Sequence, residues 1–166
     1  MPIDAAALFE QHHASLLRYL VRLTGDLDLA HDAAQEAFAR LVMKPPRDED
    51  PRAWLFTVAT NVVRAWANAN RRRAALLERA AARVPAADPA PDPLAATQAG
   101  ERREALRRAL AQLSEKERTI LLMREEGFAH REIAQAVGTT TGSVGTMIAR
   151  ALDKLAAALP LDADAL

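Results

Sequence analysis

The 166-residue chain contains no cysteine, which excludes disulfide bonds and thiolate metal sites. Aromatic residues make up only 4% of the chain, although half of its residues are hydrophobic. Alanine is abundant in that hydrophobic half, and alanine favours helices that pack closely on one another over sheets. The composition therefore predicts an all-α fold with a hydrophobic core.

Long apolar runs are also missing. No stretch approaches the roughly 20 residues that a membrane span needs. The first residues, MPIDAAALFEQHH, lack the basic start and apolar stretch of a signal peptide, so we expect a cytoplasmic protein with no membrane insertion. The formal net charge is zero, which argues against a nonspecific polycation. Bases nevertheless outnumber acids in residues 1–84 and in residues 101–159, so local clusters matter more than the total.

Catalytic and metal-binding patterns are absent as well. The four histidines do not form a metal-ligand set, and the serines have no evident base partner. The segment TGSVG, residues 141–145, lacks the lysine and the preceding strand of a phosphate-binding loop. We therefore expect that the protein is not an enzyme and holds no metal or cofactor.

A proline-rich segment divides the chain. Residues 85–97, PAADPAPDPLAAT, combine four prolines with alanine and aspartate, which excludes a regular helix and offers no core. Extended, this segment could reach ~40 Å at about 3.1 Å per residue. We interpret it as a linker between two small helical domains, residues 1–84 and 98–160, followed by a tail, residues 161–166.

Apolar residues at helical spacing predict three helices in the N-terminal domain, at residues 5–24, 28–43 and 51–83. In the third helix, Trp54 and Trp66 share an apolar stripe with Val58 and Val62, so core packing is the favoured interpretation of both tryptophans. Exposure of one edge of Trp66 is the alternative that stays open. Polar side chains lie opposite the apolar stripes of the second and third helices: Asp32, Gln35, Glu36 and Arg40, and Thr57, Asn61, Arg64, Asn68 and Arg71.

The C-terminal domain ends in a pattern of short helix, tight turn and second helix. The segment SEKE, residues 114–117, fits a capping box, and HREIAQAV predicts a short helix before a turn at Gly138 that needs a positive φ. The last helix follows, and the whole pattern is the helix-turn-helix arrangement of many DNA-binding proteins. Six residues of the last helix are expected to form its buried stripe: Val144, Ile148, Ala151, Leu152, Leu155 and Leu159.

Two interpretations of the last helix stay open: it reads DNA, or it only packs on the other helices. The second is open because residues 139–149 carry no charge and include Gly142 and Gly145. Gly145 costs roughly 1 kcal/mol relative to alanine within a helix. The two glycines would let the backbone approach phosphates at the helix N-terminus. The polar side chains available to DNA are Arg131, Thr141, Ser143, Thr146 and Arg150.

Three segments follow one another in the order and spacing of a known family: DLAHDAAQEAFARL, DPRAWLFTVATNVVRAWANANRRR and ALAQLSEKERTILLMREEGFAHREIAQAVGTTTGSVGTMIARAL. Together they resemble bacterial extracytoplasmic-function (ECF) sigma factors, the small members of the main sigma family of RNA polymerase. The resemblance covers roughly residues 5–159. Where that family's reading helix usually carries basic or polar residues, this chain has Gly145, Met147 and Ala149.

The resemblance implies that the protein binds core RNA polymerase, at the β′ clamp helices and the β subunit, and directs promoter recognition and opening. It implies a core-docking face of Asp32, Gln35, Glu36 and Arg40. It assigns the loop MKPPRDED to capture of a flipped base of the minus-ten element, and the reading and holding of that element to Asn61, Arg64, Asn68, Arg71, Arg72 and Arg73. It assigns recognition of the minus-thirty-five element to Arg131, Thr141, Ser143, Thr146 and Arg150. An anti-sigma protein is an expected further partner.

Two other hypotheses compete with a sigma factor. A stand-alone helix-turn-helix regulator of duplex operator DNA would explain residues 114–159 but leaves the first domain as a generic bundle. A helical adaptor that binds only proteins would leave the basic faces unexplained. The linker favours a sigma factor, because two separated promoter elements need two tethered DNA-binding domains.

Overall fold

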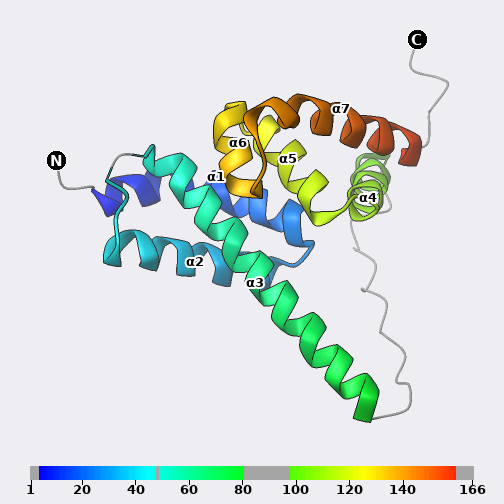
Figure 1. Ribbon diagram of the computed structural model, residues 1–166, viewed down its shortest axis with the longest axis horizontal. Helices are drawn as coiled ribbons and strands as arrows, with labels where there is room; N and C mark the ends of the chain where they lie inside the picture. Colours follow the sequence, from blue (N-terminus) through cyan, green and yellow to red (C-terminus); the bar gives the residue numbers. More distant parts are fainter. Residues whose placement is uncertain (1–3, 48, 81–97, 160–166) are drawn as a thin grey trace.

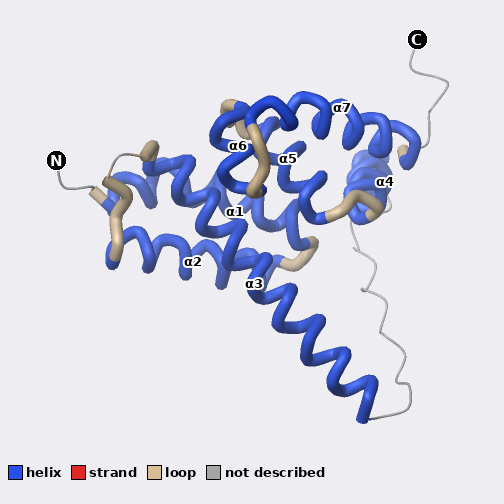
Figure 2. The backbone as a smooth tube through the Cα atoms, in the orientation of Figure 1, coloured by secondary structure: helices blue, strands red, loops and turns tan. Residues whose placement is uncertain are grey.

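Seven helices and no strand make up the part of the chain that the computed structural model describes, residues 4–47, 49–80 and 98–159 (Figures 1 and 2). The helices are α1 (Ala5–Thr24), α2 (Leu27–Met43), α3 (Pro51–Ala80), α4 (Gln98–Ala111), α5 (Glu115–Glu125), α6 (His130–Val137) and α7 (Thr141–Ala158). The all-α prediction is confirmed. The predicted linker, the predicted helical residues 81–83 and the tail lie outside the described residues, and the predicted domain boundaries remain predictions.

The N-terminal helices, α1 to α3, begin at aspartates. The Asp4 carboxylate accepts hydrogen bonds from the amides of Ala6 and Ala7, and Asp26 and Asp50 serve α2 and α3 in the same way. Such N-caps satisfy amides that have no partner within the helix. Helix α1 ends at Gly25, whose φ of 72° suits a residue without Cβ.

The core between α1, α2 and α3 contains many small side chains. Helix α2 buries Ala30, Ala33, Ala34 and Ala37, which lets α1 and α3 approach it closely. Leu16, Leu20 and Leu23 of α1 are buried in the same core.

The buried stripe of α3 agrees with the prediction at Val62 but differs from it at the two tryptophans. Phe56 and Thr60 are fully enclosed, whereas Trp54 and Trp66 are only partly buried at the edge of the core. The reason is that α3 packs on α1 and α2 on one side and on α6 on another. The part of the α3 surface that other helices cover is therefore wider than a single stripe, and its centre lies away from the tryptophans.

A buried hydrogen bond joins α1 to α3. The hydroxyls of Tyr19 and Thr60 lie 2.7 Å apart, and Thr60 also donates to the Phe56 carbonyl. Burial raises the pKa of Tyr19 well above its ordinary value of 10.0. The neutral phenol is thus the form that the folded protein retains.

Tyr19→Phe is expected to reduce the free energy of unfolding by about 1 kcal/mol, because Thr60 loses a partner. The wild-type protein should also lose stability above about pH 10, since the unfolded state releases the tyrosine proton there while the folded state keeps it. Urea titrations at pH 8 and pH 10.5 measure both effects. An unchanged difference between wild type and Tyr19→Phe at the two pH values would contradict the second.

The C-terminal helices, α4 to α7, contain the predicted turn. The capping box is present, with Ser114 accepting from the Glu117 amide and the Glu117 carboxylate accepting from the Ser114 amide. Gly138 separates α6 from α7 with a φ of 67°. The α7 stripe is only partly as predicted: Val144 and Ala151 are buried, but Leu152 is 50% exposed. Helix α4 covers only part of α7, so this leucine remains uncovered.

The two groups of helices pack against each other. Helix α5 lies on α1 and α6 lies on the first half of α3, whereas the second half of α3 projects away from the other helices (Figure 1). With 30 residues, α3 is about 45 Å long, so its outer turns stand clear of the core.

Candidate functional sites

The predicted polar face of α2 is present on the surface. Asp32, Gln35 and Arg40 are exposed and Glu36 is half-buried. The Nε atom of Arg40 lies 2.7 Å from Oε1 of Glu36, one helical turn away. The opposite side of α2 is the alanine side that packs in the core, so this face is available to a partner without disturbing the fold.

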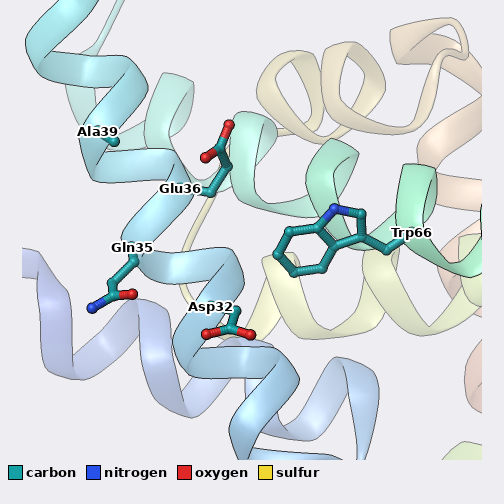
Figure 3. Close-up of a pocket in the computed structure, with 5 residues that line it drawn as sticks. All are labelled: Asp32, Gln35, Glu36, Ala39 and Trp66. Atoms are coloured by element: carbon teal, nitrogen blue, oxygen red, sulfur yellow. The ribbon is translucent and has the colours of Figure 1, made fainter.

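An open pocket of about 570 Å³ lies beside this face. Its lining combines three polar residues of α2, Asp32, Gln35 and Glu36, with Ala39 and with Trp66 of α3. Figure 3 shows Asp32 and Glu36 on one side and the indole of Trp66 on the other. Two carboxylates and an aromatic face suit a lysine or arginine side chain, through ion pairing and cation–π contact.

Trp66 was not predicted as part of this site. The sequence placed it on an apolar stripe at four-residue spacing, which favours core packing. Its partly buried position and its place in the pocket depend on how α3 crosses α2. The sequence left edge exposure of Trp66 open but did not place this side chain beside the polar face of α2.

A second polar face runs along α3. The amide oxygens of Asn61 and Asn68 accept from Arg64 and Arg71, at 3.5 and 2.7 Å respectively. Arg72 and Arg73 are exposed on the projecting part of the helix. The structure therefore brings most of the predicted nucleic-acid residues of α3 to one side, where arginines and amides could contact phosphates and bases.

One residue of this face has an unexpected partner. The Nε atom of Arg64 lies 2.9 Å from Oε1 of Glu115 at the start of α5, and both side chains are 31% exposed. Arg71 lies 3.9 Å from the other oxygen of the same carboxylate. The sequence did not predict that the C-terminal helices would contact this face.

The helix-turn-helix presents a small polar surface. Arg131, the second residue of α6, Thr141, the first residue of α7, and the α7 residues Thr146 and Arg150 are exposed, and Ser143 is half-buried. The Ser143 hydroxyl lies 2.8 Å from that of Thr140, and the first amides of α7 receive no side-chain cap. The Ser143 amide instead donates to the Thr140 carbonyl at 3.0 Å.

Packing does not require the glycines of α7. A Cβ added to Gly142 would meet nothing within 4 Å, and one added to Gly145 would meet only His130 Cε1, at 3.8 Å. Both positions would therefore accept the Cβ of alanine without a clash.

The described residues contain no cluster of three potential metal ligands. Among the helices that the structure describes, none is long and apolar enough to cross a membrane. The exposed surfaces described above are basic on the outer part of α3 and mainly uncharged and polar at the helix-turn-helix.

Comparison with known protein families gives the class. Residues 8–73 match Sigma-70 region 2, and residues 103–155 match Sigma-70, region 4. The chain belongs to the sigma-70 family, in its ECF group.

Curated relatives agree with this membership. The ECF RNA polymerase sigma factor SigL of Mycobacterium tuberculosis is 46% identical over 61 residues, which are 34% of each chain. The probable ECF RNA polymerase sigma factor SigI of the same organism is 32% identical over 162 residues, which are 93% of this chain and 54% of SigI. The chain thus spans between one third and about half of the length of these relatives.

Solved structures share the fold. The sigma factor RpoE of Bartonella quintana, solved with the anti-sigma factor NepR, superposes with a TM-score of 0.70 and 20% identity, covering 96% of this chain and 98% of that one. CnrH, solved with the cytosolic domain of CnrY, gives a TM-score of 0.60 with 23% identity, covering 92% and 85%.

Proposed function

We propose that this protein is an RNA polymerase sigma factor that binds core polymerase and directs promoter recognition and opening. The observation that carries the proposal is the succession of a region 2 match and a region 4 match in one chain, each with an exposed polar surface. A stand-alone operator-binding regulator would not need region 2. In this role the protein itself catalyses nothing, because the polymerase makes the RNA, and it acts in the cytoplasm.

Each surface has a proposed partner. The α2 face, Asp32, Gln35, Glu36 and Arg40, would dock on the β′ clamp helices, and the C-terminal helices would contact the β subunit. The α3 face would hold the minus-ten element: Asn61, Arg64, Asn68, Arg71, Arg72 and Arg73. The helix-turn-helix would contact the minus-thirty-five element: Arg131, Thr141, Ser143, Thr146 and Arg150. Arginines near exposed bases and phosphates suit the two DNA surfaces.

An anti-sigma protein is a further proposed partner. Support comes from two proteins of the same fold that were solved with such partners, RpoE with NepR and CnrH with the cytosolic domain of CnrY. Because those proteins share less than 25% identity with this chain, they support the possibility of such a partner and not its identity.

Reconstitution with purified core polymerase tests the proposal. Core alone transcribes nonspecifically, so the expected result is a transcript with a defined start site that appears only when this protein is added. Promoter fragments selected from genomic DNA of the source organism supply the template. Absence of both core binding and defined transcripts would contradict the proposed function.

Arg150→Ala is expected to weaken promoter binding more than Lys154→Ala. Arg150 is exposed on α7, whereas the ammonium of Lys154 pairs with the Glu117 carboxylate within the C-terminal helices and lowers the pKa of Glu117. Loss of one phosphate or base contact predicts a roughly 5- to 20-fold reduction for Arg150→Ala. Gel-shift titration of the polymerase holoenzyme on promoter DNA measures the ranking, and a larger effect of Lys154→Ala would contradict it.

Trp66→Ala is expected to weaken core binding about 5- to 20-fold, because one wall of the α2 pocket is lost. Trp66→Phe keeps an aromatic face and should retain most of the affinity. Trp54→Phe provides the matched control at a tryptophan outside the pocket lining. Binding of fluorescently labelled protein to core polymerase measures these affinities, and equal effects of Trp66→Ala and Trp66→Phe would contradict the cation–π explanation.

A further inference from the structure

His130 is a polar residue of the helix-turn-helix that has no place yet in either proposed DNA surface. It is the first residue of α6, next to the exposed Arg131, and α6 packs side by side with α7 (Figure 1). Cε1 of its ring lies 3.8 Å from the position that a Cβ on Gly145 of α7 would occupy. The imidazole therefore lies against the flank of α7, at a residue that has no side chain of its own.

Both ring nitrogens of His130 are available to a ligand. Among the residues that the structure describes, no group pairs with Nδ1 or Nε2 of this ring. The same residues contain no buried side-chain nitrogen without a hydrogen-bond partner, so both nitrogens are accessible to solvent. The ring itself is half-buried, which means that packing and not a hydrogen bond holds it beside α7.

The charges around His130 favour an anion as its ligand. The guanidinium of Arg131 is exposed and has no hydrogen-bond or ion-pair partner among the described residues. Glu132, the one acidic residue of α6, accepts a hydrogen bond from the Ala129 amide at 2.7 Å and is thus engaged at the start of the helix. Residues 141–149, the part of α7 that contains Gly145, carry no charge. An anion at this point would meet one cation and an imidazole donor.

Helix α7 lacks donors of its own on this side. Gly142, Gly145 and Ala149 follow one another at intervals of three and four residues, so they lie along one side of the helix. All three are exposed, and none has a side-chain group that can donate to DNA. A donor on this side must therefore come from a neighbouring helix, and His130 of α6 lies beside the middle residue of the three.

The position of His130 in the motif favours a phosphate over a base. In helix-turn-helix proteins the second helix lies in the major groove, whereas the first helix crosses the DNA backbone. Helix α6 is the first of the two here, and His130 is its first residue. Contacts to phosphates fix the position of a protein on DNA without reading its sequence. An imidazole N–H can donate to a phosphate oxygen in either tautomer of the ring.

Resting on the proposed function, we propose that His130 is a further promoter-binding residue, whose imidazole donates a hydrogen bond to one backbone phosphate of the minus-thirty-five element. The contact supplies a donor at the side of α7 where Gly145 has none. Because packing beside α7 already restricts the ring, little side-chain freedom is lost when the phosphate binds. The phosphate contact positions α7 on the DNA, and base recognition remains with the polar side chains of α7.

Substitutions of His130 test the contact in the holoenzyme, on the promoter fragment that yields a defined transcript. His130→Ala should weaken binding about 3- to 10-fold, the effect of one net hydrogen bond. His130→Phe keeps a flat ring beside Gly145 but has no nitrogen, so it should lose as much affinity even if alanine disturbs the packing. His31→Ala removes an exposed histidine of α2, outside both proposed DNA surfaces, and should bind within about twofold of wild type. Wild-type affinity of His130→Phe would overturn the proposal.

Neutral methylphosphonates identify the phosphate and exclude a purely structural role. One methylphosphonate replaces each backbone phosphate of the minus-thirty-five element in turn, and the affinities of wild type and His130→Phe are compared. One replacement should weaken wild type but leave His130→Phe nearly unaffected, whereas phosphates contacted by other residues should cost both proteins the same. A structural role would lower the affinity of the variant for every fragment by one common factor. That common factor, or a changed preference for one base pair in its place, would overturn the phosphate contact.

The wild-type protein separates this proposal from the proposed function. If the wild-type holoenzyme shows neither specific promoter binding nor a defined transcript, the proposed function fails. If the wild type is active and His130→Phe equals it in affinity and in its methylphosphonate profile, only the role of His130 is contradicted. Circular dichroism melting of each variant checks that the helices remain folded.

Discussion

Asp32→Lys/Glu36→Lys is expected to lower affinity for core polymerase by about 10- to 100-fold without unfolding the protein. Each change replaces an attraction to a basic partner surface by a repulsion. Glu36→Lys also removes the 2.7 Å ion pair with Arg40 and leaves two cations side by side. The fold should persist because both side chains lie on the outer face of α2, away from its buried alanines.

Fluorescence anisotropy of labelled protein titrated with core polymerase measures this loss, and circular dichroism melting checks the fold. Glu10→Lys/Glu101→Lys is the matched control, because it makes the same total charge change at two exposed sites on α1 and α4. If the control lost as much affinity, the effect would be one of net charge and the α2 face would not be the docking site. Unchanged affinity of the α2 variant would contradict the assignment directly.

Helix positions could be predicted from the sequence because their determinants are local. The bounds of α1 and α6 agree with the prediction, and α2 begins one residue earlier. Aspartates at the helix starts, the capping box of α5 and the positive φ of Gly138 all follow from backbone hydrogen-bonding needs that a few neighbouring residues satisfy. The polar faces of α2 and α3 follow from helical periodicity for the same reason.

Burial on a second side of a helix could not be predicted in this way. Phe56 and Thr60 face α1 and the C-terminal helices, so their burial depends on a tertiary contact with residues such as Phe128, more than 60 positions away. Periodicity identifies the single most apolar stripe, which in α3 was the one containing the tryptophans. Leu152 of α7 shows the opposite error: it was predicted to be buried and is exposed. The apolar stripe of α7 extends beyond the surface that α4 covers.

The proposed binding surfaces also combine features set by local sequence with features set by tertiary contacts. Their residues could be selected from the resemblance to a family and from periodicity, but their electrostatic partners could not. Neither the pairing of Arg64 with Glu115 nor that of Lys154 with Glu117 has a signal in local sequence, because each joins side chains brought together only by the tertiary fold. These pairings decide which cations on the proposed DNA surfaces already have a carboxylate partner.

The three consecutive arginines at the outer end of α3 provide the other large expected effect. Arg71→Gln/Arg72→Gln/Arg73→Gln should lower holoenzyme affinity for promoter DNA by roughly 10- to 100-fold near physiological salt. All three side chains are exposed. Arg72 and Arg73 follow on the part of α3 that projects from the other helices (Figure 1), and Arg71, at its base, also lies 3.9 Å from Glu115. Glutamine keeps the helix and the hydrogen-bonding capacity while removing the charge.

The salt dependence separates phosphate contact from general electrostatic attraction. Loss of three phosphate contacts should flatten the slope of log affinity against log salt by about 2 to 3, because each contact releases roughly 0.7 to 0.9 counterions. Arg102→Gln/Arg103→Gln/Arg108→Gln removes the same charge from exposed positions of α4, outside the proposed DNA surfaces, and should leave the slope nearly unchanged. Equal slopes for the two triple variants would show that Arg71, Arg72 and Arg73 do not contact the phosphates.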